Sequence, residues 1–278
     1  MKKRESGFSR LFLIIVGSIV LVIVTGYLWG FQTMVWWEYR HNFAKKLPIL
    51  NLTPQDLPKV AASPAEGMTL SHAGFEFEVP WVDLDGQKSK YFKKIVIYVF
   101  QSGRVITVFG LNPTHDDLLA AVEKSFDDKN GTLPKLFGEE TTRTDYVFLR
   151  TMLEQTPDKL KPWMNERQSY RVSFLLMIKG ISSVGGETGL FHVEDKGWKG
   201  FQYDDPAKKP KKVTLELYDS EDQHIEIMFS AGKQEGAEIL QSDVNRVLQT
   251  LVLAAANSNT AAKSDVTPRS KGQRKPRG

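Results

Sequence analysis

Cysteine is absent from this chain of 278 residues. Its absence excludes disulfide bonds, thiolate metal sites and a cysteine nucleophile. A domain of ordinary size folds without disulfide bonds, so the lack of cysteine does not indicate the redox compartment. Histidine is scarce as well, with five residues in the chain, which restricts histidine-based metal and acid–base sites.

The sequence also lacks the short motifs of several common enzyme classes. It contains no glycine-rich nucleotide loop, no Gly-x-Ser-x-Gly elbow and no His-Glu-x-x-His zinc motif. The most glycine-rich stretch, 185–189, follows a predicted helix and precedes a predicted strand, whereas a phosphate loop needs the opposite order. We interpret this stretch as a connector. No catalytic, cofactor-binding or metal-ligating residue is therefore assigned by motif.

Charged residues are missing from the whole stretch 11–37. About 20 apolar residues suffice for a helix that crosses the hydrocarbon core of a bilayer, so 11–37 is predicted to be a transmembrane anchor. Trp36 and Trp37 close this stretch at the level expected for lipid headgroups, although a protein contact would also explain them. No small-residue cleavage site follows, so we expect an uncleaved signal anchor.

Basic residues flank the predicted anchor unevenly. The short tail 1–10 carries four of them, and three follow the anchor within ten residues. The more basic flank of a membrane span tends to stay in the cytoplasm. We therefore predict a single-pass protein of the cytoplasmic (inner) membrane, with its N-terminus in the cytoplasm and its domain outside, as a periplasmic domain would be.

The net charge of +4 is concentrated at the two ends of the chain. The first ten residues carry +3 and residues 257–278 carry +5, which leaves −4 for the remainder. A mildly acidic domain disfavours a nucleic-acid partner. The stretch 257–278 has too few apolar residues to fold, so we expect a disordered basic tail that keeps the chain soluble or binds anionic lipid.

Two further segments are predicted between the anchor and the basic tail: a spacer, 38–67, and one domain, 68–256. Proline occurs four times in the spacer, and such a composition is typical of semi-extended segments. The anchor helix is expected to continue to about residue 47, because Pro48 then ends it.

The domain shows strand patterns in its first and last parts. Apolar and polar residues alternate in 74–81, as expected of a half-buried strand. Runs of β-branched and aromatic residues at 94–109 and 213–229 are each divided by a short polar turn, which predicts two hairpins. Shorter strands are predicted at 190–193 and 198–203.

Helices are predicted at 114–130, within 144–184 and at 242–255. In the last helix of 144–184, a stripe at helical spacing is expected to face the core: Tyr170, Phe174, Met177, Ile178 and Ile181. Hairpins combined with separate helices indicate an α+β fold. The predicted fold is thus one N-terminal transmembrane helix, then an antiparallel sheet of two hairpins with packed helices and a C-terminal helix.

Five polar residues on or beside the predicted strands are candidates for chemistry: His192, Glu194, Asp219, Asp222 and His224. His192 with Glu194, and His224 with Glu226, would each project from one face of a strand. Such pairs bind a metal when a second strand adds ligands. The simpler interpretation places both pairs on a solvent-exposed face and residues 219–222 in a solvated turn, because apolar residues occupy the alternate positions.

The absence of a catalytic constellation favours a non-catalytic binding or scaffold module of the cell envelope. Its partners would be the bilayer, through residues 11–37, and an envelope protein. One alternative is an enzyme with a His/Asp/Glu site on the sheet, which requires that His192 and His224 lie close together. Another is a cytoplasm-facing domain that binds anionic lipid through its basic tail.

Overall fold

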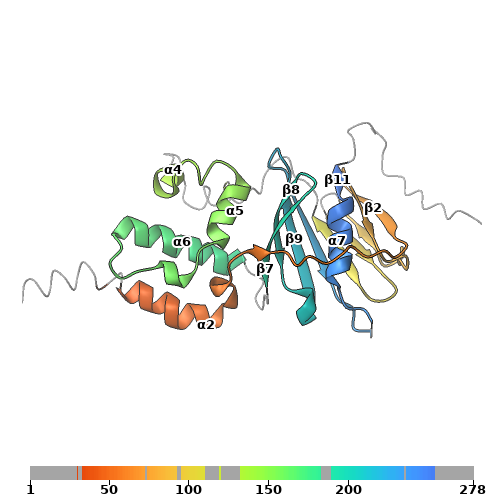
Figure 1. Cartoon of the computed structure of the whole chain (residues 1–278), viewed down its shortest axis with the longest axis horizontal. Helices are drawn as coiled ribbons and strands as arrows, with labels where there is room; N and C mark the ends of the chain where they lie inside the picture. The colour runs from red at the N-terminus through yellow and green to blue at the C-terminus, as the bar shows by residue number, and fades with distance from the viewer. Residues whose placement is uncertain are drawn as a thin grey trace, which may run out of the picture.

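The computed structural model describes residues 30, 33–72, 74–92, 95–109, 119, 132–182, 189–234 and 236–253. The two basic tails, most of the predicted anchor and nearly all of the predicted helix 114–130 lie outside these residues. Within the described part, no helix is both long and apolar enough to cross a membrane. The described residues form a mixed α+β fold, as predicted, but with two sheets where one was predicted (Figure 1).

Eight strands make up the larger sheet: β1 (Gln55–Asp56), β4 (Lys90–Tyr91), β5 (Ile95–Val99), β6 (Val105–Phe109), β7 (Leu190–Asp195), β8 (Trp198–Tyr203), β9 (Lys212–Tyr218) and β10 (His224–Ser230). Their order is β1-β7-β8-β9-β10-β6-β5-β4. Only β1 and β7 pair in parallel. The predicted hairpins are confirmed as β5–β6 and β9–β10, and the predicted short strands as β7 and β8.

A second sheet and a helix cover one face of the larger sheet (Figure 1). The second sheet has the order β11-β3-β2, with β2 (Met68–His72), β3 (Phe75–Val79) and β11 (Val252–Leu253), and the helix is α7 (Gln241–Thr250). Alternate residues of β5, β6, β9 and β10 point toward these elements and form the main core. The predicted strand at 74–81 is confirmed as β3.

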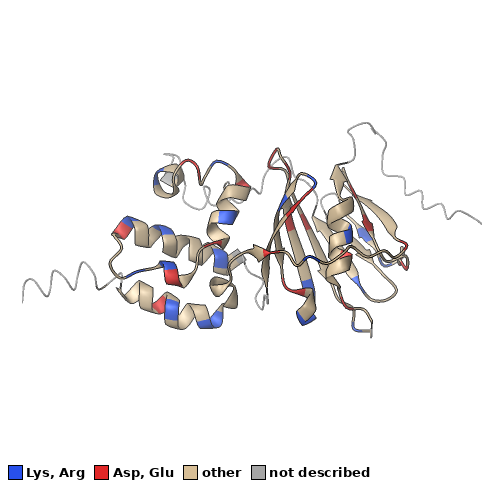
Figure 2. Cartoon of the chain, in the orientation of Figure 1, with Lys and Arg blue, Asp and Glu red and all other residues tan. Residues whose placement is uncertain are grey.

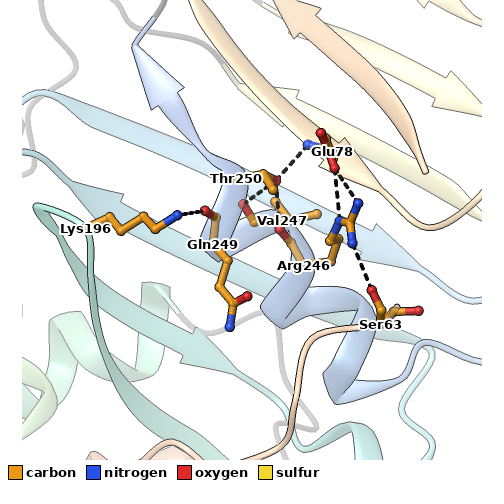
Figure 3. A network of polar contacts seen from close by, with 7 residues as sticks. All are labelled: Ser63, Glu78, Lys196, Arg246, Val247, Gln249 and Thr250. Atoms are coloured by element: carbon orange, nitrogen blue, oxygen red, sulfur yellow. Dashed lines mark hydrogen bonds and ion pairs between the residues drawn. The ribbon is translucent and has the colours of Figure 1, made fainter. Parts of the chain in front are cut away.

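Polar contacts fix α7 to β3 (Figure 3). The Arg246 guanidinium donates to Glu78 Oε2, with Nε 3.0 Å from that oxygen, and to the carbonyl of Ser63 at 3.1 Å. The Thr250 hydroxyl accepts from the backbone N–H of Glu78 at 2.8 Å. These bonds hold the amphipathic helix α7 over the main core, in the same position that its apolar packing requires.

The C-terminal helix is shorter than predicted. It ends at Thr250 instead of residue 255, because Val252 and Leu253 pair with Glu76 and Phe75 of β3. Strand pairing with a distant segment overrides the helical pattern at this point.

A helical layer packs on the opposite face, mainly against the β7–β8 part of the larger sheet (Figure 1). The chain enters this layer through a helix at 33–46, which we call the entry helix and which includes η1 (Tyr39–Phe43) and α2 (Ala44–Lys46). The other elements are η2 (Pro48–Asn51), α4 (Thr132–Phe137), α5 (Asp145–Leu153), η3 (Pro157–Lys159) and α6 (Glu166–Ser182). Their apolar residues form a second core.

The buried face of α6 differs from the predicted stripe. Phe174 is buried as expected, but Tyr170, Met177 and Ile181 are exposed. The buried face instead includes Leu175, Leu176 and the charged Lys179. A lysine on the buried face lowers its apparent hydrophobicity, so a search for an all-apolar stripe selects a neighbouring face.

The segment 38–67 is not a detached spacer over most of its length. Ile49 and Leu50 are buried in the second core, and Gln55 and Asp56 form β1 beside β7. Further on, Ser63 N–H donates to the carbonyl of Ser242 at the start of α7. This proline-containing segment is therefore ordered and packs along the domain. The entry helix ends before Pro48, as predicted.

Candidate functional site

A group of polar and aromatic side chains lies between the helical layer and the larger sheet. In β9 and β10, the residues that alternate with the main-core positions face away from that core. A tyrosine of β8 and one of α5 join them. We call the group the polar–aromatic cluster: Tyr146, Tyr203, Glu216, Tyr218, His224 and Glu226.

Glu216 is the centre of the cluster. Its carboxylate accepts hydrogen bonds from the hydroxyls of Tyr203, at 2.7 Å, and Tyr218, at 3.3 Å. His224 Nε2 lies 3.6 Å from Glu216 Oε1, and the His224 ring packs on Tyr218 with centroids 4.8 Å apart. Three neighbouring side chains thus fix the orientation of one carboxyl group.

Burial raises the pKa of Glu216, and the hydrogen bonds from the two tyrosines offset part of that rise. Burial also raises the pKa of Tyr203 and of Tyr218, and the adjacent Glu216 carboxylate adds to both shifts. The tyrosine hydroxyls therefore keep their protons and act as donors toward Glu216.

A second carboxyl group lies directly opposite the first. Glu226 of β10 pairs in register with Glu216 of β9. The pKa of Glu226 is raised by burial and then by the negative charge of Glu216, while His224 and Lys212 oppose the shift. Two facing carboxyl groups disfavour double ionisation, so this pair holds a proton at a higher pH than isolated carboxyl groups would.

Tyr146 connects the cluster to His192. Its hydroxyl lies 2.8 Å from His192 Nε2, and its ring packs on Phe201 and Tyr218. The Lys199 ammonium lies 4.6 Å from the centroid of the same ring. His192 is half-buried on β7, between β1 and β8, whereas Glu194, the other member of its predicted pair, is exposed.

The two candidate aspartates in the β9–β10 turn stabilise local structure. Asp219 Oδ1 accepts from the backbone N–H groups of Glu221 and Gln223, both at 2.8 Å. Asp222 accepts from the N–H of Asp145 at 2.7 Å, at the first turn of α5. Asp219 thus closes the turn, and Asp222 accepts hydrogen bonds from the first backbone amides of α5.

The five predicted candidates are not brought together. His192 lies on β7 and His224 on β10, with β8 and β9 between them, which corresponds to about 14 Å at ordinary strand spacing. Within the described ranges, no group of three or more histidine, cysteine, aspartate or glutamate side chains is arranged to hold a metal ion. The metal site that would join His192 to His224 is not formed by these residues.

No protein-family model matches the chain, and no curated protein is similar to it.

Glu216, Tyr203 and Tyr146 were missed by sequence reasoning. The pairing of Glu216 with Glu226 could have been predicted from the sequence, because a hairpin that pairs residue 218 with 224 also pairs 216 with 226. Two glutamates that face each other across paired strands repel each other, and such an unfavourable pair indicates a candidate functional site. The tyrosines could not be found in this way, because their approach depends on how β8 and α5 pack.

The free energy of unfolding is expected to fall as pH rises above about 4.3, the ordinary pKa of glutamate. The folded state keeps protons that the unfolded state has lost until the pH passes the raised pKa values of Glu216 and Glu226. Glu226→Gln removes one titrating group and its repulsion of the other. We expect E226Q to be about 1 kcal/mol more stable than the parent at pH 7.5, measured by urea unfolding.

Glu194→Gln is the matched control for this measurement, because Glu194 lies on the same sheet with an exposed side chain. E194Q is expected to leave the difference between pH 4.5 and pH 7.5 unchanged. Equal stabilities of E226Q and E194Q at pH 7.5 would contradict a repulsive carboxyl pair.

Proposed function

We propose that the chain is a membrane-anchored binding or scaffold module of the cell envelope, with its N-terminus in the cytoplasm and its domain outside. The observation that carries the proposal is the entry helix, which follows directly on the charge-free stretch 11–31 and is built into the domain. An anchor in this stretch would hold the domain at the membrane in one orientation.

Several contacts join the entry helix to the helical layer. The Tyr39 hydroxyl donates to the Ser173 carbonyl of α6 at 2.8 Å, and Arg40 forms an ion pair with Asp158 of η3 at 3.2 Å. Ala44, at the end of this helix, is buried. These contacts support an anchor that is continuous with the fold instead of one attached by a flexible linker.

The chemistry of the domain favours binding over catalysis. The polar–aromatic cluster combines carboxyl groups with tyrosines and a histidine, and these hydrogen bonds involve no serine, threonine or lysine nucleophile. Figure 2 shows Lys and Arg interspersed with Asp and Glu along the described helices and strands. Such a surface supports a protein partner more than a nucleic acid.

The test is a paired extraction and protease experiment on the full chain. With an epitope tag and a protease site placed after Gly278, alkaline carbonate should leave the protein in the membrane fraction. External protease should remove the tag in spheroplasts without permeabilisation. Tag removal only after permeabilisation would contradict the orientation and favour the cytoplasm-facing, lipid-binding alternative.

The control is a variant with two arginines in the middle of the proposed anchor. Val20→Arg combined with Ile23→Arg costs insertion about 5–7 kcal/mol on translocon scales, so this variant should be released by carbonate. The matched variant Val20→Leu combined with Ile23→Leu should remain in the membrane. Retention of the arginine variant would show that residues 11–37 are not what holds the protein there.

A second candidate function is catalysis or polar-ligand binding at the Glu216–Glu226 pair. The raised pKa of both carboxyl groups favours it, because perturbed acids cluster at functional sites. Under this alternative, Glu216→Gln would abolish an activity of the purified chain. The same variant would leave membrane retention unchanged.

A further inference from the structure

The entry helix and α6 lie side by side and run in the same direction (Figure 1). Tyr39 contacts Ser173, and a Cβ on Gly180 would lie 3.0 Å from the Leu47 side chain. Positions 39 and 47 of the entry helix are therefore level with 173 and 180 of α6. Continued toward the N-terminus, this alignment places the start of α6, at Glu166, level with about Thr33.

Large aromatic and apolar side chains are exposed at this end of the helical layer. Trp163, just before α6, has 70% of its surface exposed. Tyr170 on the first turns of α6, and Met34 and Trp37 on the entry helix, are exposed as well. These four side chains lie at the end of the helical layer where the chain enters from the proposed anchor. Lys161 and Arg167 flank Trp163 in the sequence.

The level of these side chains matches the expected position of the lipid headgroups. The apolar stretch 11–31 is long enough to fill a hydrocarbon core of about 30 Å. The headgroup region beyond it is about 5–7 Å thick, or about four residues of helix at 1.5 Å per residue. It would therefore coincide with the first residues of the entry helix and with the start of α6, which Trp163 precedes by three residues.

We propose that the helical layer stands on the bilayer surface next to its own anchor, with Trp163 inserted at headgroup level. This inference rests on the proposed anchor and adds a second contact with lipid. Tryptophan prefers the membrane interface because its ring is apolar and its indole N–H is polar. Lys161 and Arg167 suit the lipid phosphates at that level, so the surface has both features of an interfacial contact.

The bilayer explains this surface better than a protein partner does, because Met34, Trp37 and Tyr170 lie within about 6 Å of one another along the helix axis. Ile181, at the other end of α6, is 75% exposed but lies eleven residues, or about 16 Å, farther along the helix axis than Tyr170. Met177 lies between these two levels. Neither residue belongs to the proposed contact, and position 177 provides an internal reference for depth.

The test is tryptophan fluorescence of the full chain reconstituted in phosphatidylcholine vesicles, with and without brominated acyl chains. Trp163→Phe should remove a component of the emission that bromine quenches and that iodide in the water does not. A second variant, Met177→Trp in the W163F background, should add emission that iodide quenches and bromine does not. Both residues are exposed, so both variants are expected to fold.

Three outcomes separate this inference from the proposed function. If the chain does not float with the vesicles, the anchor itself fails. If it floats but W163F leaves the bromine-quenched emission unchanged, the anchor stands and the lipid contact at Trp163 is overturned. If bromine quenches the emission added by M177W as strongly as that of Trp163, the layer lies flat on the bilayer, and the end-on arrangement is overturned.

Discussion

Replacement of Gly200 by alanine is expected to cost about 3 kcal/mol or more of folding free energy, or to prevent folding. Gly200 lies in β8 between Val193 of β7 and Leu217 of β9. An added Cβ would clash with the backbone oxygen of Glu216 and stand 2.9 Å from Leu217 Cα. Backbone atoms in the middle of a sheet cannot move aside without breaking the ladder.

Gly86→Ala is the matched control, because no atom lies within 4 Å of a Cβ added there. Urea unfolding of the detergent-solubilised full chain should place G86A within about 0.5 kcal/mol of the parent. Similar midpoints for G200A and G86A would show that β8 and β9 separate easily. Such a result would also weaken the placement of Glu216, since the same backbone segment carries it.

Replacement of Lys179 by methionine should have the second large effect. The side chain is 1% exposed, and its ammonium donates to the carbonyls of Leu52 at 2.6 Å, Leu153 at 2.7 Å and Gln155 at 2.7 Å. These oxygens belong to the end of η2 and the end of α5. Methionine preserves the shape of the stem but leaves three buried acceptors unpaired, with a net loss of about 2–4 kcal/mol.

The same lysine predicts a pH dependence. Burial lowers the pKa of Lys179 to about 7, with the charge of Lys159 adding to the shift. Between pH 7 and the ordinary value of about 10.4, the unfolded chain binds a proton that the folded chain has lost. Stability should therefore rise with pH across this window, by about 1.4 kcal/mol per unit of pKa difference.

The pH effect is measured as the difference in the free energy of unfolding between the parent and K179M, so that the contributions of other titrating groups cancel. Lys45→Met, which replaces an exposed lysine of the same layer, should change stability by less than about 0.5 kcal/mol. A difference between parent and K179M that is constant from pH 7 to 9.5 would contradict the lowered pKa. It would show that the three carbonyls hold the ammonium fully charged.

Local patterns predicted much of the fold. The two hairpins, β3 and the helices α5 and α7 follow from periodicity and turn residues, because each buries one regular face. The α6 stripe was wrong, because a lysine satisfied by three carbonyls occupies the buried face. The spacer was misread, because its proline content describes an extended backbone but not whether that backbone is packed.

The candidate site was less accessible from sequence. Asp219 and Asp222 stand out as acids in a turn, yet their carboxylates bind backbone amides. Glu216 looked like an ordinary outward-facing strand residue, because alternation does not reveal that a helical layer covers the second face. Only the packing of α5 brings Tyr146 onto that face, and no local pattern encodes this contact.

The pairing of β3 with β11 cannot form until late in the synthesis of the chain. Residue 75 pairs with residue 253, so the ribosome delivers the second partner roughly 10–35 seconds after the first at 5–20 residues per second. Until then, Phe75, Phe77 and Val79 lack the helix and strand that later cover them. The nascent chain therefore exposes the apolar face of β3 until α7 and β11 are made.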